Sequence, residues 1–163
     1  MEIEITSYPS FENKYDRGIE VLLSRAYVEA GFTDPTVAQK FFSIEEVKKR
    51  GKILLGIDSI EAVVGMVIVG MNENPYRQIA EMDEAEMQLL ATLPTVRQKG
   101  IGENLCRHFE IEARSLGFSK AVLSTQSSME AAHRLYEKLG YRRDPSRDWI
   151  RSDRQFWVYE KKI

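Results

Sequence analysis

The chain has very little cysteine and no long apolar run, and both absences narrow the class of protein. Cys106 is the single cysteine among 163 residues, so no intrachain disulfide can form and nothing suggests an oxidising compartment. The longest apolar stretch, residues 62–71, is about half as long as a transmembrane helix must be. The N-terminal residues 1–5 lack the basic start and apolar core of a signal peptide. We therefore expect a soluble, cytoplasmic protein with no membrane partner.

The chain also lacks a strong charge of either sign, and it lacks low-complexity segments and linkers. Its formal net charge of -2 argues against a nucleic-acid-binding protein that works through a broad basic surface. A hydrophobic fraction of 43% and a charged fraction of 29% are ordinary globular values. His108 and His133 have no second histidine or carboxylate at metal-ligand spacing. We expect one domain over residues 1–163, with no metal and no nucleic-acid partner.

What the sequence does contain is a regular succession of strands and helices. The first half predicts a strand near residues 3–5, helices over 13–30 and 44–50, and a hairpin of strands 52–57 and 62–71. The second helix is expected to begin at a capping box of Ser43 and Glu46. The second half predicts strands over 85–92, 120–124 and 155–161, alternating with helices over 100–116 and 128–139. Residues 144–154 are expected to be irregular. Strand-helix-strand units place neighbouring parallel strands at the centre of a mostly antiparallel sheet.

The turn between the strand at 85–92 and the following helix is the most informative stretch. It carries two glycines, Gly100 and Gly102, and two basic residues, Arg97 and Lys99. Glycine lets the backbone turn tightly and approach a ligand, and the first N–H groups of a helix attract anions. A phosphate or pyrophosphate is the expected ligand, although the glycines alone also fit an ordinary strand-to-helix turn.

Two other glycine motifs do not fit this turn. A dinucleotide-binding fingerprint needs a third glycine three residues after Gly102, and Leu105 stands there. A P-loop needs Gly-Lys-Ser/Thr, and Gly102 is followed by Glu103 and Asn104. Both motifs are therefore rejected.

Two segments together resemble the GCN5-related N-acetyltransferases. The first is Arg97-x-x-Gly100-x-Gly102, preceded by Leu90-Ala91-Thr92 and Pro94, which resembles the acetyl-CoA signature of that family. The second is the run Met129-x-x-Ala132-x-Arg134-Leu135-Tyr136-Glu137-Lys138-Leu139-Gly140-Tyr141. The order of these two segments and the distance between them fit the family, and the firm match covers residues 84–144. The resemblance implies an α/β fold: a mixed, mostly antiparallel sheet of about six or seven strands with a parallel splayed pair, flanked by about four helices.

The resemblance also implies acetyl-CoA as cosubstrate. The edge of Leu90, Ala91 and Thr92 is expected to pair with amides of the pantetheine arm, because a bulge or Pro94 would leave it free. The expected phosphate turn consists of Arg97, Gln98, Lys99, Gly100, Ile101, Gly102 and Glu103. Many family members have asparagine where this chain has Met129, which removes one polar contact to the cofactor arm; Ser127 or Ser128 could compensate.

Two side chains are predicted to be catalytic. Glu86 aligns, by the resemblance, with a general-base glutamate that often acts through water, although the acidic run 83–86 also fits a solvated strand entrance. Gln88, on the same face, could orient a water or the substrate. Tyr136 aligns with the tyrosine that protonates the leaving thiolate; its ordinary pKa near 10 suits a thiol near 8.5. A core aromatic is the alternative for Tyr136, and Cys106 is expected in the core.

We predict an N-acetyltransferase that transfers the acetyl group of acetyl-CoA by direct attack of a primary amine of a small molecule, peptide or protein. A non-catalytic acyl-CoA-binding, sensing or interaction domain of the same fold is the alternative, and a nicotinamide oxidoreductase is a third. By the resemblance, residues 30–43 and 144–155 select the acceptor. The second of these segments could instead form the contact of a homodimer.

Overall fold

A computed structural model describes residues 2–9 and 12–163 of the chain. The strands form one sheet in the order β1-β2-β3-β4-β5-β8-β6, and β7 also pairs with β8. They are β1 (Ile3–Ser7), β2 (Gly51–Asp58), β3 (Val63–Gly70), β4 (Glu84–Thr92), β5 (Lys120–Gln126), β6 (Arg142–Arg143), β7 (Trp149–Arg151) and β8 (Arg154–Lys162). Among the described strands, β4 and β5 form the parallel pair and the other neighbours are antiparallel.

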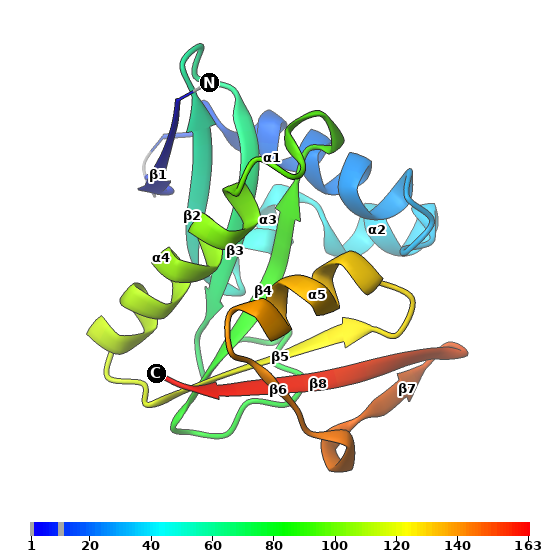
Figure 1. Ribbon diagram of the computed structural model, residues 1–163. Helices are drawn as coiled ribbons and strands as arrows, with labels where there is room; N and C mark the ends of the chain where they lie inside the picture. The colour runs from blue at the N-terminus through cyan, green and yellow to red at the C-terminus, as the bar shows by residue number, and fades with distance from the viewer. Residues whose placement is uncertain (1, 10–11) are drawn as a thin grey trace.

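Helices cover both faces of the sheet (Figure 1). They are α1 (Asp16–Leu23), a π-helical turn (Ser24–Val28), α2 (Pro35–Phe41), α3 (Ile44–Lys48), α4 (Ile101–Ser115) and α5 (Glu130–Lys138), with 3-10 turns at Pro94–Val96 and Pro145–Arg147. Residues of α4 and α5 such as Leu105, Phe109 and Tyr136 pack on one face. Residues of α1 and α3 such as Ile19 and Val47 pack on the other. No helix within the described ranges is long and apolar enough to cross a membrane.

The parallel strands β4 and β5 separate part of the way along their length. Their pairing runs from Glu84 opposite Lys120 to Met87 opposite Leu123 and then stops, and the two strands diverge in Figure 1. Leu89 has a φ of 49°, and the register between β3 and β4 shifts at this point. A leucine in the left-handed region is strained, and a bulge bends the strand that carries it. Beyond Met87, the edge of β4 that faces β5 is therefore unpaired.

The predicted fold class is confirmed, including the parallel splayed pair. Gly117 and Gly140, with φ of 91° and 89°, follow α4 and α5 in the left-handed position that suits glycine after a helix. The described chain contains eight strands rather than six or seven, because the short β6 and β7 occupy a segment that lacks periodicity. A second difference is α2, which no pattern predicted.

The predicted capping box at α3 is wrong. Ser43 is the N-cap residue of α3, but its side chain makes no capping hydrogen bond. The carboxylate of Glu46 instead accepts hydrogen bonds from Lys49 and Tyr76. A long-range partner in the loop between β3 and β4 has replaced the local contact that the Ser43–Glu46 spacing indicated.

Candidate active site

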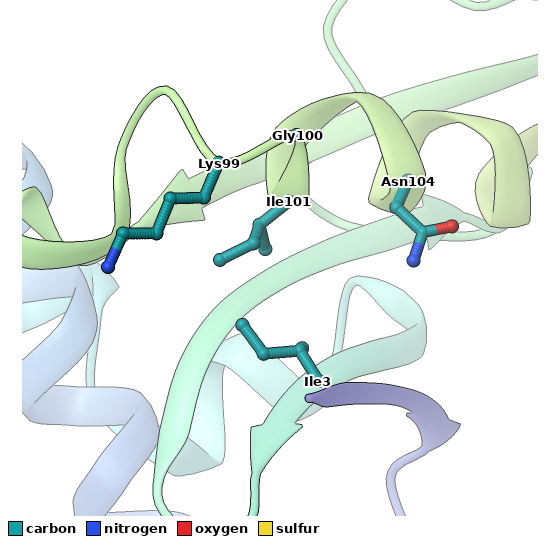
Figure 2. Close-up of a pocket in the computed structure, with 5 residues that line it drawn as sticks. All are labelled: Ile3, Lys99, Gly100, Ile101 and Asn104. Carbon is teal, nitrogen blue, oxygen red and sulfur yellow. The ribbon is translucent and has the colours of Figure 1, made fainter. Parts of the chain in front are cut away.

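The turn that leads into α4 presents a row of free backbone donors; residues 97–103 are called the α4 turn below. Gln98 and Gly100 have φ of 63° and 78°, which bends the chain sharply before the helix. In the described part of the chain, no N–H group of residues 98–103 has a backbone acceptor. A hollow of about 420 Å³ lies between this turn and β1, and Figure 2 shows Lys99, Gly100, Ile101 and Asn104 on one side of it and Ile3 on the other. Free N–H groups with a lysine at a helix N-terminus fit an anion such as a pyrophosphate.

The side chains of the α4 turn have different roles. Arg97 and Lys99 are exposed and available to a ligand. The Glu103 carboxylate forms ion pairs with Arg107 and Lys138, at 2.8 and 2.7 Å, so its negative charge is compensated. A Cβ atom at Gly102 would lie 3.3 Å from Leu135, so this glycine allows α4 to approach α5 closely.

The β4 edge predicted to meet the pantetheine arm carries a side-chain contact that the sequence did not reveal. The Tyr27 hydroxyl, from the π-helical turn, donates a hydrogen bond of 2.8 Å to the Leu90 carbonyl. Burial raises the pKa of Tyr27 to about 12, so the group stays a donor at neutral pH. Ala91 and Thr92 pair on their other side with Met66 and Gly65 of β3. Tyr27 lies on the apolar face of the helix predicted over 13–30, but apolar spacing does not reveal a hydrogen bond to a residue 63 positions away.

Tyr136 lies inside the core formed by α4, α5 and the sheet. Its side chain is 6% exposed, and its ring centroid lies 6.0 and 5.9 Å from those of Tyr141 and Tyr159. Burial raises the pKa of Tyr136 well above its ordinary value, so the hydroxyl keeps its proton at neutral pH. A protonated hydroxyl can donate to a leaving thiolate and cannot act as a base. The catalytic role of Tyr136 stays a prediction.

Glu86 is buried, at 2% exposure, and is not a solvated residue at a strand entrance. Its carboxylate accepts hydrogen bonds from the N–H groups of Gln78 and Ile79, at 3.0 and 2.9 Å, and from the Gln88 amide at 2.9 Å. These bonds attach the loop between β3 and β4 to the sheet. Gln88 lies on the same face, as predicted, and its role and that of Glu86 in catalysis stay predictions.

Glu84, in the same acidic run, is the centre of an ion-pair network. Its carboxylate contacts both terminal nitrogens of Arg147, at 2.9 and 2.8 Å, and Lys120 at 3.3 Å. Burial alone would raise the pKa of this carboxyl, but the hydrogen bonds from Arg147 and from the Glu81 N–H outweigh it and lower the pKa to about 2. The network holds the 3-10 turn at Pro145–Arg147 against β4.

A second hollow, of about 330 Å³, adjoins the point where β4 and β5 separate. It is lined by Phe41 of α2, residues 75–78, and Trp149 and Arg151 of β7, and is called the β7 hollow below. The Trp149 indole donates to the Ser124 hydroxyl at 2.9 Å, and the Gln88 amide donates to the Tyr76 carbonyl at 3.0 Å. Gln88 and Ser124 are the first residues of β4 and β5 beyond their paired part.

This hollow joins the two segments that were predicted to select the acceptor. Phe41 comes from residues 30–43, and Trp149 and Arg151 come from residues 144–155. A third wall, residues 75–78, was not predicted, because its loop carries no recognisable motif. Arg50, which precedes β2 and lies close to this wall, was also missed, because its contact with Gln88 spans 38 positions of the chain.

The remaining residues singled out in the sequence lie in structural positions. Met129 precedes α5, where its sulfur accepts a 3.8 Å hydrogen bond from the Thr125 hydroxyl. The His133 ring stacks on Trp157 at 4.8 Å. Cys106 is fully buried in the core, as expected, and burial raises the pKa of its thiol to about 12. The structure thus gives Met129, His133 and Cys106 packing contacts.

Within residues 2–9 and 12–163, no three His, Cys, Asp or Glu side chains are grouped so that they could hold a metal ion.

Comparison with known proteins identifies the class to which this fold and site belong. The family model described as Acetyltransferase (GNAT) family matches residues 18–141. Since this match covers most of the chain, the protein belongs to the GNAT acetyltransferase family. Over 62 residues the chain is 36% identical to the uncharacterised N-acetyltransferase YjgM of Escherichia coli K12, a match that spans 38% of this chain and 37% of that protein.

Solved structures share the whole fold. An acetyltransferase of Streptococcus agalactiae 2603 matches with a TM-score of 0.75 at 22% identity, covering 99% of this chain and 98% of that chain. The PaiA N-acetyltransferase of Thermoplasma acidophilum, solved in complex with coenzyme A, matches with a TM-score of 0.76 at 16% identity over all of both chains. At these identities the likeness shows the fold alone.

Proposed function

We propose that this protein is an N-acetyltransferase that transfers the acetyl group of acetyl-CoA to a primary amine by direct attack. The observation that carries the proposal is the α4 turn, whose free N–H groups lie at the end of a β4 strand with an unpaired edge. Family membership supports acetyl transfer in general. The N-acetyltransferase described for YjgM supports nitrogen as the accepting atom.

The residues present fit acetyl-CoA. The free N–H groups of residues 98–103, with Arg97 and Lys99, would hold the pyrophosphate, since backbone donors at a helix N-terminus favour anions. The edge of Leu90, Ala91 and Thr92 would pair with the amides of the pantetheine arm, as an added strand does. Acetyl-CoA supplies an acetyl group on a sulfur that leaves readily.

The side chains around the separated strands would manage two protons. An alkylammonium group with a pKa near 10 must lose a proton before its nitrogen can attack. Glu86 would accept that proton through a water that Gln88 could orient, since its carboxylate bonds to Gln88 and to the N–H of Gln78, a residue that lines the β7 hollow. Tyr136 would donate its hydroxyl proton to the departing sulfur from the opposite face of the sheet. The two groups thus act on opposite sides of the separated strands.

A thiol-release assay with acetyl-CoA and a library of primary amines tests this function, together with the melting temperature of the protein with and without acetyl-CoA. A ligand that binds the native state raises the melting temperature by mass action. We expect a thermal shift and release of thiol that depends on the amine. A shift without thiol release for any amine would instead identify a non-catalytic acyl-CoA-binding domain.

A cytoplasmic location, a homodimer and the lack of nucleic-acid or membrane partners stay predictions. Size-exclusion chromatography with light scattering tests the homodimer directly.

A further inference from the structure

Two arginine side chains line the β7 hollow and a third packs against the ring of a lining residue, and none of the three forms an ion pair. Arg77 and Arg151 line it, and the guanidinium carbon of Arg50 lies 4.2 Å from the centroid of the Tyr76 ring in its wall. No ion pair recorded for the described residues includes any of the three. The three guanidinium groups therefore give the region of the hollow positive charge that no direct ion pair neutralises.

The carboxylates close to the hollow are already engaged. Glu46 forms an ion pair with Lys49 at 2.6 Å and accepts a hydrogen bond from the Tyr76 hydroxyl. Glu86 is held by two backbone N–H groups and by Gln88. Glu46 is thus compensated by Lys49, while the charge of Glu86 favours the charged form of Arg50. The single charge of Glu86 cannot balance three arginines.

Arg50 is the most informative of the three, because its guanidinium group is buried and its hydrogen bonds are long or missing. Its side chain is 7% exposed, and its Nε atom has no acceptor in the described residues. Its terminal nitrogens reach neutral oxygens of Gln88 and Phe41 at 3.3 and 3.4 Å, which are long hydrogen bonds. Burial lowers the pKa of Arg50 to about 10, and the nearby charge of Arg151 acts in the same direction. A buried cation of this kind is stabilised by a counter-charge, which a bound ligand can bring.

The walls between these charges are aromatic. The rings of Phe41 and Tyr76 meet edge to face at 5.7 Å, and Trp149 stacks on Phe156 at 4.1 Å. A volume of about 330 Å³ is at the lower end for small-molecule pockets, roughly 300 to 1000 Å³. Its chemistry suits one small molecule with an apolar side chain and a negative charge.

We propose that the acceptor amine also carries a carboxylate, as an amino acid with an apolar or aromatic side chain does, and that this carboxylate binds among Arg50, Arg77 and Arg151. The proposal rests on the proposed function. The amino nitrogen, placed toward Gln88 and Ser124, forms a bond to the acetyl carbon while the bond from that carbon to sulfur breaks. Of the two protons that the ammonium group loses, one leaves to solvent and one balances the proton gained by the sulfur. The carboxylate is unchanged.

Matched pairs of amines test the proposal in the thiol-release assay. Each amino acid is compared with the amine that lacks its carboxylate: phenylalanine with phenethylamine, tyrosine with tyramine, leucine with isoamylamine. We expect kcat/KM to be at least roughly tenfold higher for the favoured amino acid, as for a charged hydrogen bond. In the presence of CoA, that amino acid should raise the melting temperature more than its decarboxylated partner does.

Two variants assign the preference to the hollow. Arg151→Gln should lower the ratio of kcat/KM between amino acid and amine by roughly tenfold, because it removes one charge from the rim. Arg114→Gln, at an exposed arginine in the last turn of α4, is the matched control and should keep the ratio.

The outcomes separate this proposal from the proposed function. Equal or faster acetylation of the decarboxylated amines, or of polyamines, overturns the carboxylate proposal and leaves the acetyltransferase function intact. An unchanged ratio in Arg151→Gln also overturns it. Binding of acetyl-CoA without turnover of any amine overturns both.

Discussion

The α4 turn and the β7 hollow lie on either side of the separated strands and are built in different ways. The turn consists of consecutive residues, and its binding groups are backbone N–H groups at the start of a long helix. The hollow collects side chains from α2, from the loop between β3 and β4, and from β7. One region therefore depends on backbone conformation, and the other depends on side-chain identity and on contacts that hold three segments together.

This difference determines what each region tolerates. Backbone donors persist when most side chains in the turn change, so the turn suits a ligand that is constant, such as a nucleotide cofactor. The walls of the hollow change with every substitution at its lining residues, so the hollow suits a ligand that differs from one protein to another. Mutations that affect one of the two regions and leave the other unchanged test this comparison.

The largest expected effect is that of Glu84→Gln, which should weaken the hollow and spare the turn. Removing the Glu84 charge leaves Arg147 with only a 3.6 Å contact to Glu160, whereas Lys120 keeps Glu160 at 2.7 Å. We expect a cost of about 3 kcal/mol in the free energy of unfolding, at the lower end for breaking a buried pair. Because Arg147 holds the chain just before β7, kcat/KM for the acceptor should also fall, while the thermal shift with acetyl-CoA remains. Urea denaturation and the thiol-release assay measure both. Glu61→Gln, at an exposed ion pair, is the control and should have little effect on either.

The pH dependence of this stability follows from the pKa of Glu84. The pKa in the folded protein, about 2, lies below the ordinary value of 4.5, so the ionised carboxylate stabilises the fold above pH 4.5. That contribution is lost as the pH falls from 4.5 toward 2. The difference in urea midpoint between the natural protein and Glu84→Gln should therefore shrink over this range. A difference that stays constant down to about pH 2 would contradict the assignment.

Tyr136→Phe should lower kcat by roughly 10²-fold if the hydroxyl protonates the leaving sulfur, while the affinity for acetyl-CoA changes little. Tyr141→Phe is a matched control, since Tyr141 lies in the same cluster and its buried hydroxyl has no partner in the described residues. Single-turnover kinetics and a binding titration measure the two quantities. A Tyr136→Phe protein with full activity would make this residue a packing aromatic.

Gly100→Val should weaken acetyl-CoA binding by roughly tenfold, because a β-branched residue resists the left-handed conformation and shifts the N–H groups of the turn. Nothing lies within 4 Å of the position that its Cβ would occupy, so the effect is on backbone conformation and not on packing. Gly117→Val is matched in φ and open space but lies at the other end of α4. Titration of acetyl-CoA should show weaker binding in the first variant only; equal binding in both would place the pyrophosphate elsewhere.

The same contrast explains how far the sequence could be interpreted. The α4 turn, the two glycine helix ends and the β4–β5 pair are local or periodic features, and their patterns predicted them. Tyr27 and Arg50 reach their partners across 63 and 38 positions of the chain, and no spacing rule reveals such contacts. The hollow was therefore predicted only as two separate segments, without its third wall or its arginines.

The smallest effect is expected for Glu86→Gln. Glu86 connects the two regions of the comparison, since it lies on β4 and its carboxylate holds the loop that lines the hollow. If Glu86 is the general base, the variant should lose several-fold in rate at low pH, where little free amine exists, and the loss should vanish above the pKa of the amine. If the carboxylate only attaches the loop, the glutamine keeps one oxygen that accepts from Gln78 and Ile79 but places an N–H donor against the Gln88 amide, and the loss is the same at every pH. A rate profile from about pH 6 to 10, measured with the best acceptor, separates these outcomes. A defect in kcat/KM that does not vary with pH would end the assignment of Glu86 as a base and make it a residue that positions the acceptor.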